Sequence, residues 1–329
     1  MHTFEYVRAT DTREVVQLLA DDPAAACLAG GTTQLDLMKD GVLEPPTLID
    51  ITRLPLHGIE RRGEILHVGA LVTMEELAAD ATVAERLPMV REALLQGASV
   101  QLRNMATIGG NLLQRTRCRY FRDPTVSACN KRTPDSGCAA VEGVARMHAV
   151  LGASERCIAL HASDLAVALV ALDAAVHVQG PSHSRTVPLT EFYLTAAESP
   201  QRENVLEHAE LITEVEIPLP PAAARSGYLK VRDRTSYEFA LTSAAVLLVV
   251  DHATIRQARV GLGGVGTKPW RAYEAEHVLT GAPTTTATFL DAADATMRDA
   301  WTVPGTAFKV PLARRTLVRE LQNVSGVDV

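Results

Sequence analysis

Four cysteines are concentrated in one stretch of the chain. The sequence contains five in total, and four occur with ten, eight and eighteen residues between successive members: Cys118, Cys129, Cys138 and Cys157. None of them forms the close Cys-x2-4-Cys pair that is typical of structural zinc sites. Thiolates from separate loop segments can instead reach the corners of a larger four-iron cluster. Spacing alone leaves three interpretations open: an iron–sulfur site, a zinc site, or unrelated thiols and redox disulfides.

Basic side chains are frequent in the same stretch. Four thiolates around a cluster leave net negative charge, which nearby cations would offset. A solvated basic loop would explain the same pattern. The residues concerned are Arg115, Arg117, Arg119, Arg122, Lys131 and Arg132.

Two double-glycine segments lie about 80 residues apart. In the first, an apolar run is followed by Gly30-Gly31-Thr32-Thr33 and then by a helical pattern, and in the second the order is Thr107-Ile108-Gly109-Gly110-Asn111. Free backbone amides at such a helix start can bind a phosphate group, and glycine allows the ligand to come close. One such segment could equally be an ordinary capped turn. Two of them favour a long ligand that carries a diphosphate.

A third glycine run, Gly261 to Gly266, has the spacing of a dinucleotide-binding fingerprint and follows an expected strand. That fingerprint requires a helix to open inside the motif and an acidic residue about 20 positions later. Here Pro269 delays the helix until after the last glycine, and Glu274 and Glu276 come too early. We therefore predict that this run does not bind a nucleotide.

Strand and helix patterns alternate before residue 218 and indicate a mixed α and β architecture, and strands followed by helices after residue 227 predict the α+β class. A linker containing three prolines, at 218–227, separates two parts, and we place a domain boundary there, giving domains 1–221 and 222–329. In the first part, strands are expected at 47–51, 65–68 and 175–178, and helices at 11–19 and 85–96. In the second, strands are expected at 244–250 and 254–260, and helices at 271–279, 286–301 and 311–322.

Composition excludes several classes of function. A chain of 329 residues with 47% hydrophobic and 22% charged residues is long enough for two globular domains of about 150 residues each. The net charge of -7 gives no reason to expect nucleic acid as a partner. The longest apolar run, Ala244 to Val250, is far below the roughly 18 residues of a membrane helix, and residues 1–8 do not resemble a signal peptide.

Four segments together resemble the FAD-binding medium subunit of the xanthine dehydrogenase family of molybdenum hydroxylases, over nearly the whole chain. They are Leu28-Ala29-Gly30-Gly31-Thr32, Thr107-Ile108-Gly109-Gly110-Asn111, Leu211-Ile212-Thr213-Glu214-Val215 and Gly227-Tyr228-Leu229-Lys230. Within that family, residues 115–123, Cys129-Asn130-Lys131-Arg132 and Ser136-Gly137-Cys138 resemble the iron–sulfur insertion of the periplasmic aldehyde oxidoreductases of bacteria.

The resemblance implies a two-part FAD-binding domain like that of vanillyl-alcohol oxidase, with a [4Fe-4S]-binding insertion at about 114–162. A smaller α+β domain like the C-terminal domain of the CO dehydrogenase flavoprotein would follow. It implies four cluster ligands, Cys118, Cys129, Cys138 and Cys157, and leaves Cys27 as a buried strand residue. The implied FAD contacts are Leu28, Ala29, Gly30, Gly31, Thr32, Thr33, Gln34, Leu35, Thr107, Gly110, Asn111, Asp164, Ile212 and Lys230. Gln34 stands where some relatives have an acid.

The function implied by the resemblance is electron transfer. Electrons from a molybdenum cofactor would arrive through [2Fe-2S] clusters on partner subunits and leave through FAD to an external acceptor, while the assembly oxidises an aldehyde to a carboxylic acid. The partners would be a large molybdenum-cofactor subunit and a small [2Fe-2S] subunit in a heterotrimer or a multiple of it, and this chain would hold no catalytic residue.

Co-export with a signal-bearing partner would place the complex in the periplasm, and a partner without a signal would leave it in the cytoplasm. Two alternatives stay open: a subunit of a 4-hydroxybenzoyl-CoA reductase-like enzyme, and a zinc-stabilised binding module without redox function.

Overall fold

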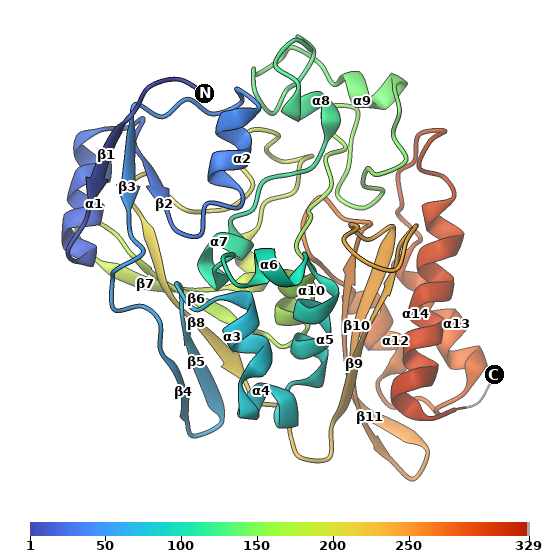
Figure 1. Ribbon diagram of the computed structural model, residues 1–329. Helices are drawn as coiled ribbons and strands as arrows, with labels where there is room; N and C mark the ends of the chain where they lie inside the picture. The colour runs from blue at the N-terminus through green and yellow to red at the C-terminus, as the bar shows by residue number, and fades with distance from the viewer. Residues whose placement is uncertain (328–329) are drawn as a thin grey trace.

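Three β-sheets organise the chain, and a computed structural model describes residues 1–327 (Figure 1). The first sheet is parallel, with strand order β1-β3-β2, where β1 is Glu5–Arg8, β2 is Ala26–Leu28 and β3 is Thr47–Asp50. Helix α1 (Thr12–Asp21) connects β1 to β2, and its N-terminus is capped by Asp11, which accepts hydrogen bonds from two backbone amides. Helix α2 (Gln34–Lys39) follows β2 directly.

The second sheet is antiparallel, with strand order β4-β5-β8-β6-β7. Its strands are β4 (Ile59–Arg62), β5 (Ile65–Gly69), β6 (Ala175–Gln179), β7 (Ser184–Pro188) and β8 (Leu211–Pro218). Alternate residues of the three central strands point into the main hydrophobic core, as expected for a sheet with one buried face: Leu66, Val68, Val176, Val178, Val215 and Ile217. The strands predicted at 65–68 and 175–178 are confirmed.

Short helices cover the core face of this sheet. They are α3 (Met74–Ala79), α4 (Ala81–Arg86), α5 (Pro88–Gln96), α6 (Val100–Arg103), α7 (Ile108–Leu112), α10 (Asp164–Ala171) and α11 (Leu189–Phe192). The single helix predicted at 85–96 is wrong, because the chain breaks at Leu87 between α4 and α5. Pro88 occupies the first turn of α5, where its missing amide hydrogen costs nothing, but it cannot continue a preceding helix.

The third sheet is antiparallel, with strand order β12-β11-β10-β9, where β9 is Arg225–Val231, β10 is Thr242–Asp251, β11 is Thr254–Gly263 and β12 is Trp270–Arg271. Helices α12 (Tyr273–Leu279), α13 (Thr286–Thr296) and α14 (Lys309–Ser325) follow it and share a hydrophobic core with β10 and β11. Two predicted helices are shorter than expected, since 270–271 pairs as β12 and α13 ends at Thr296 rather than at 301.

The third glycine run belongs to this sheet and not to a nucleotide loop. Gly261 and Gly263 lie in β11, and a Cβ atom at either position would fall 2.5 to 2.7 Å from atoms of Val167 on α10. These glycines let α10 approach the strand closely. The prediction that the run is not a dinucleotide fingerprint is confirmed.

Residues 113–163 form an irregular segment that holds only two short helices, α8 (Arg119–Arg122) and α9 (Ala139–Glu142) (Figure 1). It begins after α7 and ends at α10, and all four clustered cysteines lie in it. Part of the segment packs on the C-terminal half of the chain, because Val150 donates its backbone N–H to the carbonyl of Val265 and Leu151 forms a bridge with Gly266.

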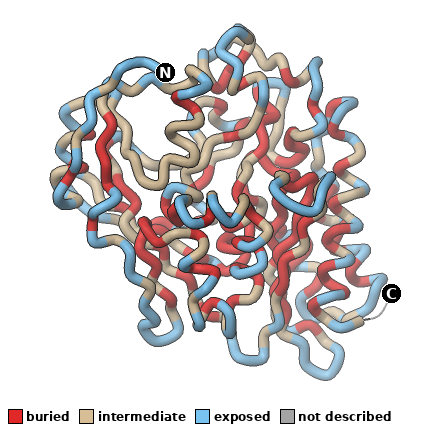
Figure 2. The backbone as a smooth tube through the Cα atoms, viewed as in Figure 1, coloured by how far each residue is buried: buried red, intermediate tan, exposed pale blue. Residues whose placement is uncertain are grey.

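Helix α10 lies between the second and third sheets and is buried along its whole length from Leu165 to Ala171 (Figure 2). It contacts α5 on one side and β10, β11 and β12 on the other. One hydrophobic cluster therefore joins residues from both halves, such as Val68 and Leu247. The second and third sheets are antiparallel, and α12, α13 and α14 follow the third sheet as a group, which confirms the α+β class. Within residues 1–327, none of the helices combines the length and the hydrophobicity that crossing a bilayer requires.

Candidate functional site

The two double-glycine loops contact one another. A Cβ atom at Gly30 would lie only 1.7 Å from the backbone carbonyl oxygen of Met105, so no other residue fits there without separating the loops. Gly31 adopts a φ of 71°, a left-handed conformation that favours glycine. Segments 75 residues apart therefore come together because Gly30 has no side chain where it meets the Met105 carbonyl.

The second loop is held by backbone contacts. Gly109 donates its N–H to the carbonyl of Ala70 at 2.9 Å, and a Cβ at Gly109 would crowd that same carbonyl at 3.1 Å. Thr107 caps α7, because its hydroxyl accepts the N–H of Gly110 at 3.2 Å. Backbone contact with Ala70, which directly follows β5, thus holds the loop in place. Thr107, Gly110 and Asn111 of the loop line the cavities.

Two cavities of about 390 and 270 Å³ meet at these loops, and Thr32, Thr33 and Gly110 line both. Pockets of this size, with a few polar groups among apolar walls, are typical of cofactor sites. The other predicted residues divide between them. Asn111, Asp164 and Lys230 line the larger cavity, and Ala29, Gly30, Gly31, Gln34, Thr107 and Ile212 line the smaller one.

Leu28 and Leu35 line neither cavity. Their side chains lie against Gly31, at 3.5 and 2.9 Å from the position of its missing Cβ. These two side chains pack against the loop and not against the cavities. Any contact of either residue with a ligand would therefore have to come from its backbone. Cys27 lies on β2, as predicted, and borders the smaller cavity, where burial raises the pKa of its thiol to about 12.

One polar atom of a residue that lines the smaller cavity has no hydrogen-bond partner among residues 1–327. Gln34 Nε2 is buried and donates no hydrogen bond. A buried amide donor without an acceptor is costly, so it is expected where a ligand supplies the acceptor. Together with the glycine cradle and the threonine hydroxyls, this donor makes the residues suitable for FAD, a ligand rich in acceptor oxygens.

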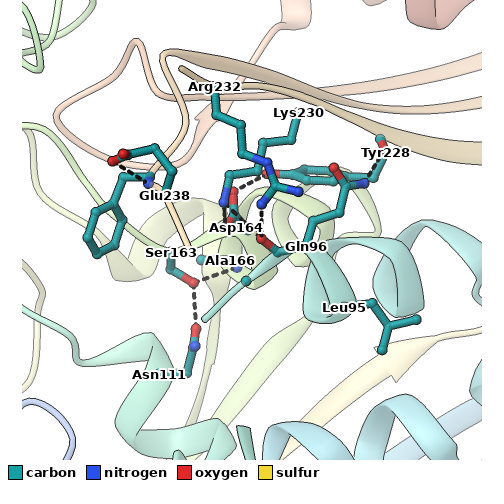
Figure 3. A network of polar contacts seen from close by, with 12 residues as sticks. Leu95, Gln96, Asn111, Ser163, Asp164, Ala166, Tyr228, Lys230, Arg232 and Glu238 are labelled. Carbon is teal, nitrogen blue, oxygen red and sulfur yellow. Dashed lines mark hydrogen bonds and ion pairs between the residues drawn. The ribbon is translucent and has the colours of Figure 1, made fainter. Parts of the chain in front are cut away.

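A network of hydrogen bonds forms one wall of the larger cavity (Figure 3). The carboxylate of Asp164 accepts from the Tyr228 hydroxyl at 2.6 Å and from Lys230 Nζ at 2.7 Å. Lys230 also donates to the carbonyl oxygen of Gln96 at 3.0 Å. Burial, and then the neighbouring Asp164 carboxylate, raise the pKa of Tyr228 well above its usual value, so this residue remains a neutral donor. The network joins the start of α10 to β9 and fixes Asp164 in place.

Sequence reasoning missed a second set of cavity residues: Asp36, Arg117, Arg234, Tyr237, Glu238 and Phe239. The guanidinium group of Arg117 lies 5.1 Å from the ring centre of Phe239 and 2.9 Å from a carboxylate oxygen of Asp36. Four of the six are in the 232–241 connection between β9 and β10. No motif identifies them, because their position depends on strand pairing in a distant part of the chain.

The four clustered cysteines converge on one further cavity. Cys118, Cys129, Cys138 and Cys157 all line it, and every cysteine within residues 1–327 is a free thiol. Cys129 and Cys138 are paired by a backbone bridge. In the described chain no three of these sulfurs lie within 4.8 Å of one another, whereas a tetrahedral zinc ion would hold its four sulfurs about 3.8 Å apart. The arrangement is wider than a zinc site and suits a larger group.

Polar groups lie beside two of the sulfurs. The amide of Ala159 lies 3.5 Å from the sulfur of Cys157, and Nε2 of His148 lies 3.1 Å from the sulfur of Cys118. A hydrogen bond from the Cys157 thiol lowers the pKa of Cys138. Amide donors stabilise thiolates that hold an iron–sulfur cluster and tune its potential. Four thiols that converge on one cavity are ligands of the kind that an iron–sulfur cluster accepts.

The basic residues of this segment are not free counter-charges, which corrects one expectation. Arg115 and Lys131 form ion pairs with Glu203 at 2.6 and 3.1 Å. Arg117 and Arg122 both contact Asp36, at 2.9 and 2.6 Å. Arg132 donates to three backbone carbonyls, and only Arg119 is exposed. These side chains mainly fix the cysteine segment to the rest of the protein.

The cysteine segment and the larger cavity adjoin one another. Arg117 lines the cavity, and the next residue is Cys118. Asp36 also lines the cavity and, from α2, anchors two arginines of the cysteine segment. A ligand in the cavity and a cluster on the thiols would therefore share a wall.

Comparison with known proteins agrees with this geometry. A family model described as the FAD binding domain in molybdopterin dehydrogenase matches residues 2–220, and the model of the CO dehydrogenase flavoprotein C-terminal domain matches residues 227–322. The aldehyde oxidoreductase FAD-binding subunit PaoB of Escherichia coli is 44% identical, over 98% of both chains. The carbon monoxide dehydrogenase medium chain of Afipia carboxidovorans is 28% identical, over 85% of this chain and 80% of its own.

Solved structures agree as well. A chain of reconstituted CO dehydrogenase from Oligotropha carboxidovorans superposes with a TM-score of 0.79 at 25% identity, covering 99% of both chains. A chain of carbon monoxide dehydrogenase from Hydrogenophaga pseudoflava gives 0.77 at 26% identity, covering 99% of this chain and 98% of its own. The glycine cradle, the cavities and these matches together place the protein in the family of FAD-binding subunits of molybdopterin dehydrogenases.

Proposed function

We propose that this protein is the FAD-binding, electron-transferring subunit of a molybdenum-containing aldehyde oxidoreductase. The observation that carries the proposal is the pair of glycine loops in contact at the junction of two cavities, in a chain 44% identical to an aldehyde oxidoreductase FAD-binding subunit over nearly its full length. That relative favours an aldehyde over the thioester substrate of a 4-hydroxybenzoyl-CoA reductase.

The chain's own residues bind and orient the flavin. The amides and hydroxyls of Thr32 and Thr33 would provide donors for phosphate oxygens, and Gln34 Nε2 would donate to an acceptor in the smaller cavity. Asp164, held by Tyr228 and Lys230, presents a fixed carboxylate to the larger cavity. When bound, FAD supplies two-electron chemistry that can be divided into one-electron steps. No residue of this chain acts on the aldehyde in this proposal, and the substrate chemistry belongs to a partner.

We also propose that Cys118, Cys129, Cys138 and Cys157 hold a [4Fe-4S] cluster. Their convergence on one cavity, their spacing and the polar groups beside two of the sulfurs support this. The cluster, when bound, supplies one-electron transfer. The ion pairs of Asp36 with Arg117 and of Glu203 with Arg115 fix the position of the cysteine segment relative to the flavin cavities.

The partners proposed are a large subunit that carries the molybdenum cofactor and a small subunit that carries [2Fe-2S] clusters. Relatives named as FAD-binding subunits or medium chains support a multi-subunit assembly. We infer a heterotrimer or a multiple of it.

Cluster assembly requires reduced thiols and therefore cytoplasmic folding, after which a signal-bearing partner would carry the complex to the periplasm. Cell fractionation with and without the partner's signal tests this last point, and complex that reaches the periplasm without that signal would contradict it.

The proposal is tested by metal and flavin analysis of the complex co-expressed with its partner subunits. We expect about four irons and one FAD assignable to this chain, selective loss of that iron in Cys138→Ser, and retention of it in the matched variant Cys27→Ser. The wild-type complex should also reduce an artificial acceptor with an aldehyde substrate.

Each outcome distinguishes one part of the proposal. FAD without the additional iron would keep the flavin function and reject the cluster. A colourless, folded protein that contains zinc would reject the redox function altogether. Flavin and iron without aldehyde oxidation would keep the cofactors and reject the substrate class.

A further inference from the structure

Four potential metal ligands lie on the face of the second sheet that is opposite its hydrophobic core. Leu66 and Val68 of β5 point into the core, so His67 between them points to the other side. The same alternation directs the half-buried side chains of His177 on β6 and of Glu214 and Glu216 on β8 to this face. Strand β8 lies between β5 and β6. In the register of the sheet, His67 is opposite Glu216 and His177 is opposite Glu214.

Ligand atoms of His67, Glu214 and Glu216 all lie within 4.8 Å of one another, and His177 lies within that distance of both carboxylates but not of His67. His67 Nδ1 lies 2.8 Å from Glu214 Oε1, and His177 Nε2 lies 2.7 Å from Glu216 Oε1. The crossed distances are 3.7 Å between His67 Nδ1 and Glu216 Oε1, and 3.9 Å between His177 Nε2 and Glu214 Oε1. Each histidine nitrogen is therefore close to both carboxylates.

Ordinary hydrogen bonds do not account for the whole arrangement. His177 Nε2 is buried and makes no hydrogen bond, although a carboxylate oxygen lies 2.7 Å away, so that oxygen is off the direction of the ring N–H. On the other side of the ring, Nδ1 lies 3.3 Å from the hydroxyl of Thr186. A contact at Nδ1 leaves Nε2 as the atom that faces the carboxylates, which is how second-shell groups orient a metal-binding histidine.

We propose that His67, His177, Glu214 and Glu216 form a binding site for a divalent first-row transition metal ion such as Zn²⁺. Two imidazole nitrogens and two carboxylate oxygens are ligands that zinc accepts, and tetrahedral coordination would hold these atoms about 3.3–3.6 Å apart. The four distances between histidine nitrogens and carboxylate oxygens, from 2.7 to 3.9 Å, lie on both sides of that range, whereas the two histidines lie more than 4.8 Å apart, so the ion would bind to His67, Glu214 and Glu216 and draw His177 in as the fourth ligand. Two carboxylates also match the charge of a divalent cation.

The ion would join three neighbouring strands of the second sheet. Its ligands come from segments around residues 67, 177 and 215, and none of the four lines either flavin cavity. The role that follows is structural: the bound ion would stabilise the sheet whose strand β8 reaches the smaller cavity at Ile212. The inference is independent of the proposed flavin and cluster function.

Zinc binding to the assembled complex tests the proposal. After removal of loosely bound metal by a chelator and gel filtration, the complex is titrated with Zn²⁺ at low micromolar concentration, and zinc, iron and flavin are measured together. We expect one retained zinc per chain and a higher thermal midpoint. Affinity should fall at least about tenfold in His177→Ala and in the isosteric Glu216→Gln, with iron and FAD unchanged.

A matched control and a spectroscopic measurement make the result specific. His2 and Glu44 form an isolated, exposed ion pair at 2.9 Å, so His2→Ala should leave zinc binding unchanged. Zinc K-edge absorption should give only nitrogen and oxygen ligands at about 2.0–2.1 Å, whereas binding to the cysteines would give sulfur at about 2.3 Å. No retained zinc, equal affinity in the ligand variants, or sulfur in the coordination shell would each overturn the proposal.

Discussion

At the scale of single residues, the flavin site depends on the absence of a side chain. Gly30 touches the backbone of Met105, and the carbonyl it meets cannot move without displacing the loop that ends in Thr107. We predict that Gly30→Ala separates the two loops, lowers the free energy of unfolding by about 1–3 kcal/mol and strongly reduces FAD content. Released flavin measured by chromatography, and the thermal midpoint, report the two effects.

Gly58 provides the matched control for this substitution, because a Cβ there would meet no atom within 4 Å. Gly58→Ala should keep full flavin content and wild-type stability. Stoichiometric FAD in Gly30→Ala would show that the contact between the loops is not needed for binding.

A buried carboxyl group gives the protein a pH-dependent stability. Burial and the nearby Glu92 raise the pKa of Glu320 to about 7, against about 4.5 when unfolded. Between those values the folded state holds a proton that the unfolded state has lost, so stability falls as the pH rises, by up to about 1.4 kcal/mol per pH unit. Glu320→Gln removes this titration, and we predict a higher thermal midpoint than wild type at pH 8 but a smaller difference at pH 5.

The exposed Glu274 on α12 supplies the comparison. Glu274→Gln should leave the pH dependence of the midpoint as it is in the wild type. An increase in stability of Glu320→Gln that is equal at pH 5 and pH 8 would be evidence against a raised pKa.

At the scale of elements, helix α2 connects the larger cavity to the cysteine segment. Its Asp36 accepts from Arg117 and from Arg122, two guanidinium groups whose mutual repulsion and burial already lower the pKa of Arg117. We predict that Asp36→Asn leaves both arginines poorly compensated, and that FAD content and iron content decrease together. Flavin and iron analysis of the same preparation measures both.

Asp40, the residue that caps the C-terminal end of α2, offers the control, because among residues 1–327 its carboxylate pairs with the Arg122 guanidinium alone, at 3.0 Å, while Asp36 remains in place. Asp40→Asn should keep both cofactors. Loss of one cofactor without the other in Asp36→Asn would show that α2 does not couple the sites.

Local patterns predicted the elements well where periodicity or glycine determines them. The strand at 47–51, the helix starting after Asp11 and the glycine loops at 30–31 and 109–110 follow from a few neighbouring residues. The break at Leu87 was missed because apolar spacing continues across it. Asp36 and Phe239 were missed for a different reason: each reaches the cavity through partners more than 80 residues away. A single sequence carries no local signal for such contacts.

At the scale of the whole molecule, the flavin site is built by both halves of the chain. Lys230 and Tyr228 come from β9, beyond the predicted boundary at residue 221, yet they hold Asp164 in the first half. The core is shared as well, since Ala245 and Leu247 belong to the same hydrophobic cluster as the second sheet. The two halves are thus joined by a buried interface that includes the cofactor cavity.

This shared core predicts that residues 1–221 do not fold alone, although the FAD family model spans 2–220. Without β10 and β11, one face of α10 would be open to water, and each Val or Leu exposed there would lose about 1.5–3 kcal/mol of burial. We expect the fragment to aggregate, to bind a hydrophobic dye and to retain no FAD. Co-expression of residues 222–329 should restore a soluble, flavin-containing complex, because that fragment returns both the cover for α10 and the partners of Asp164. A monomeric 1–221 fragment with a sharp thermal transition would instead show that the first half folds independently of the second.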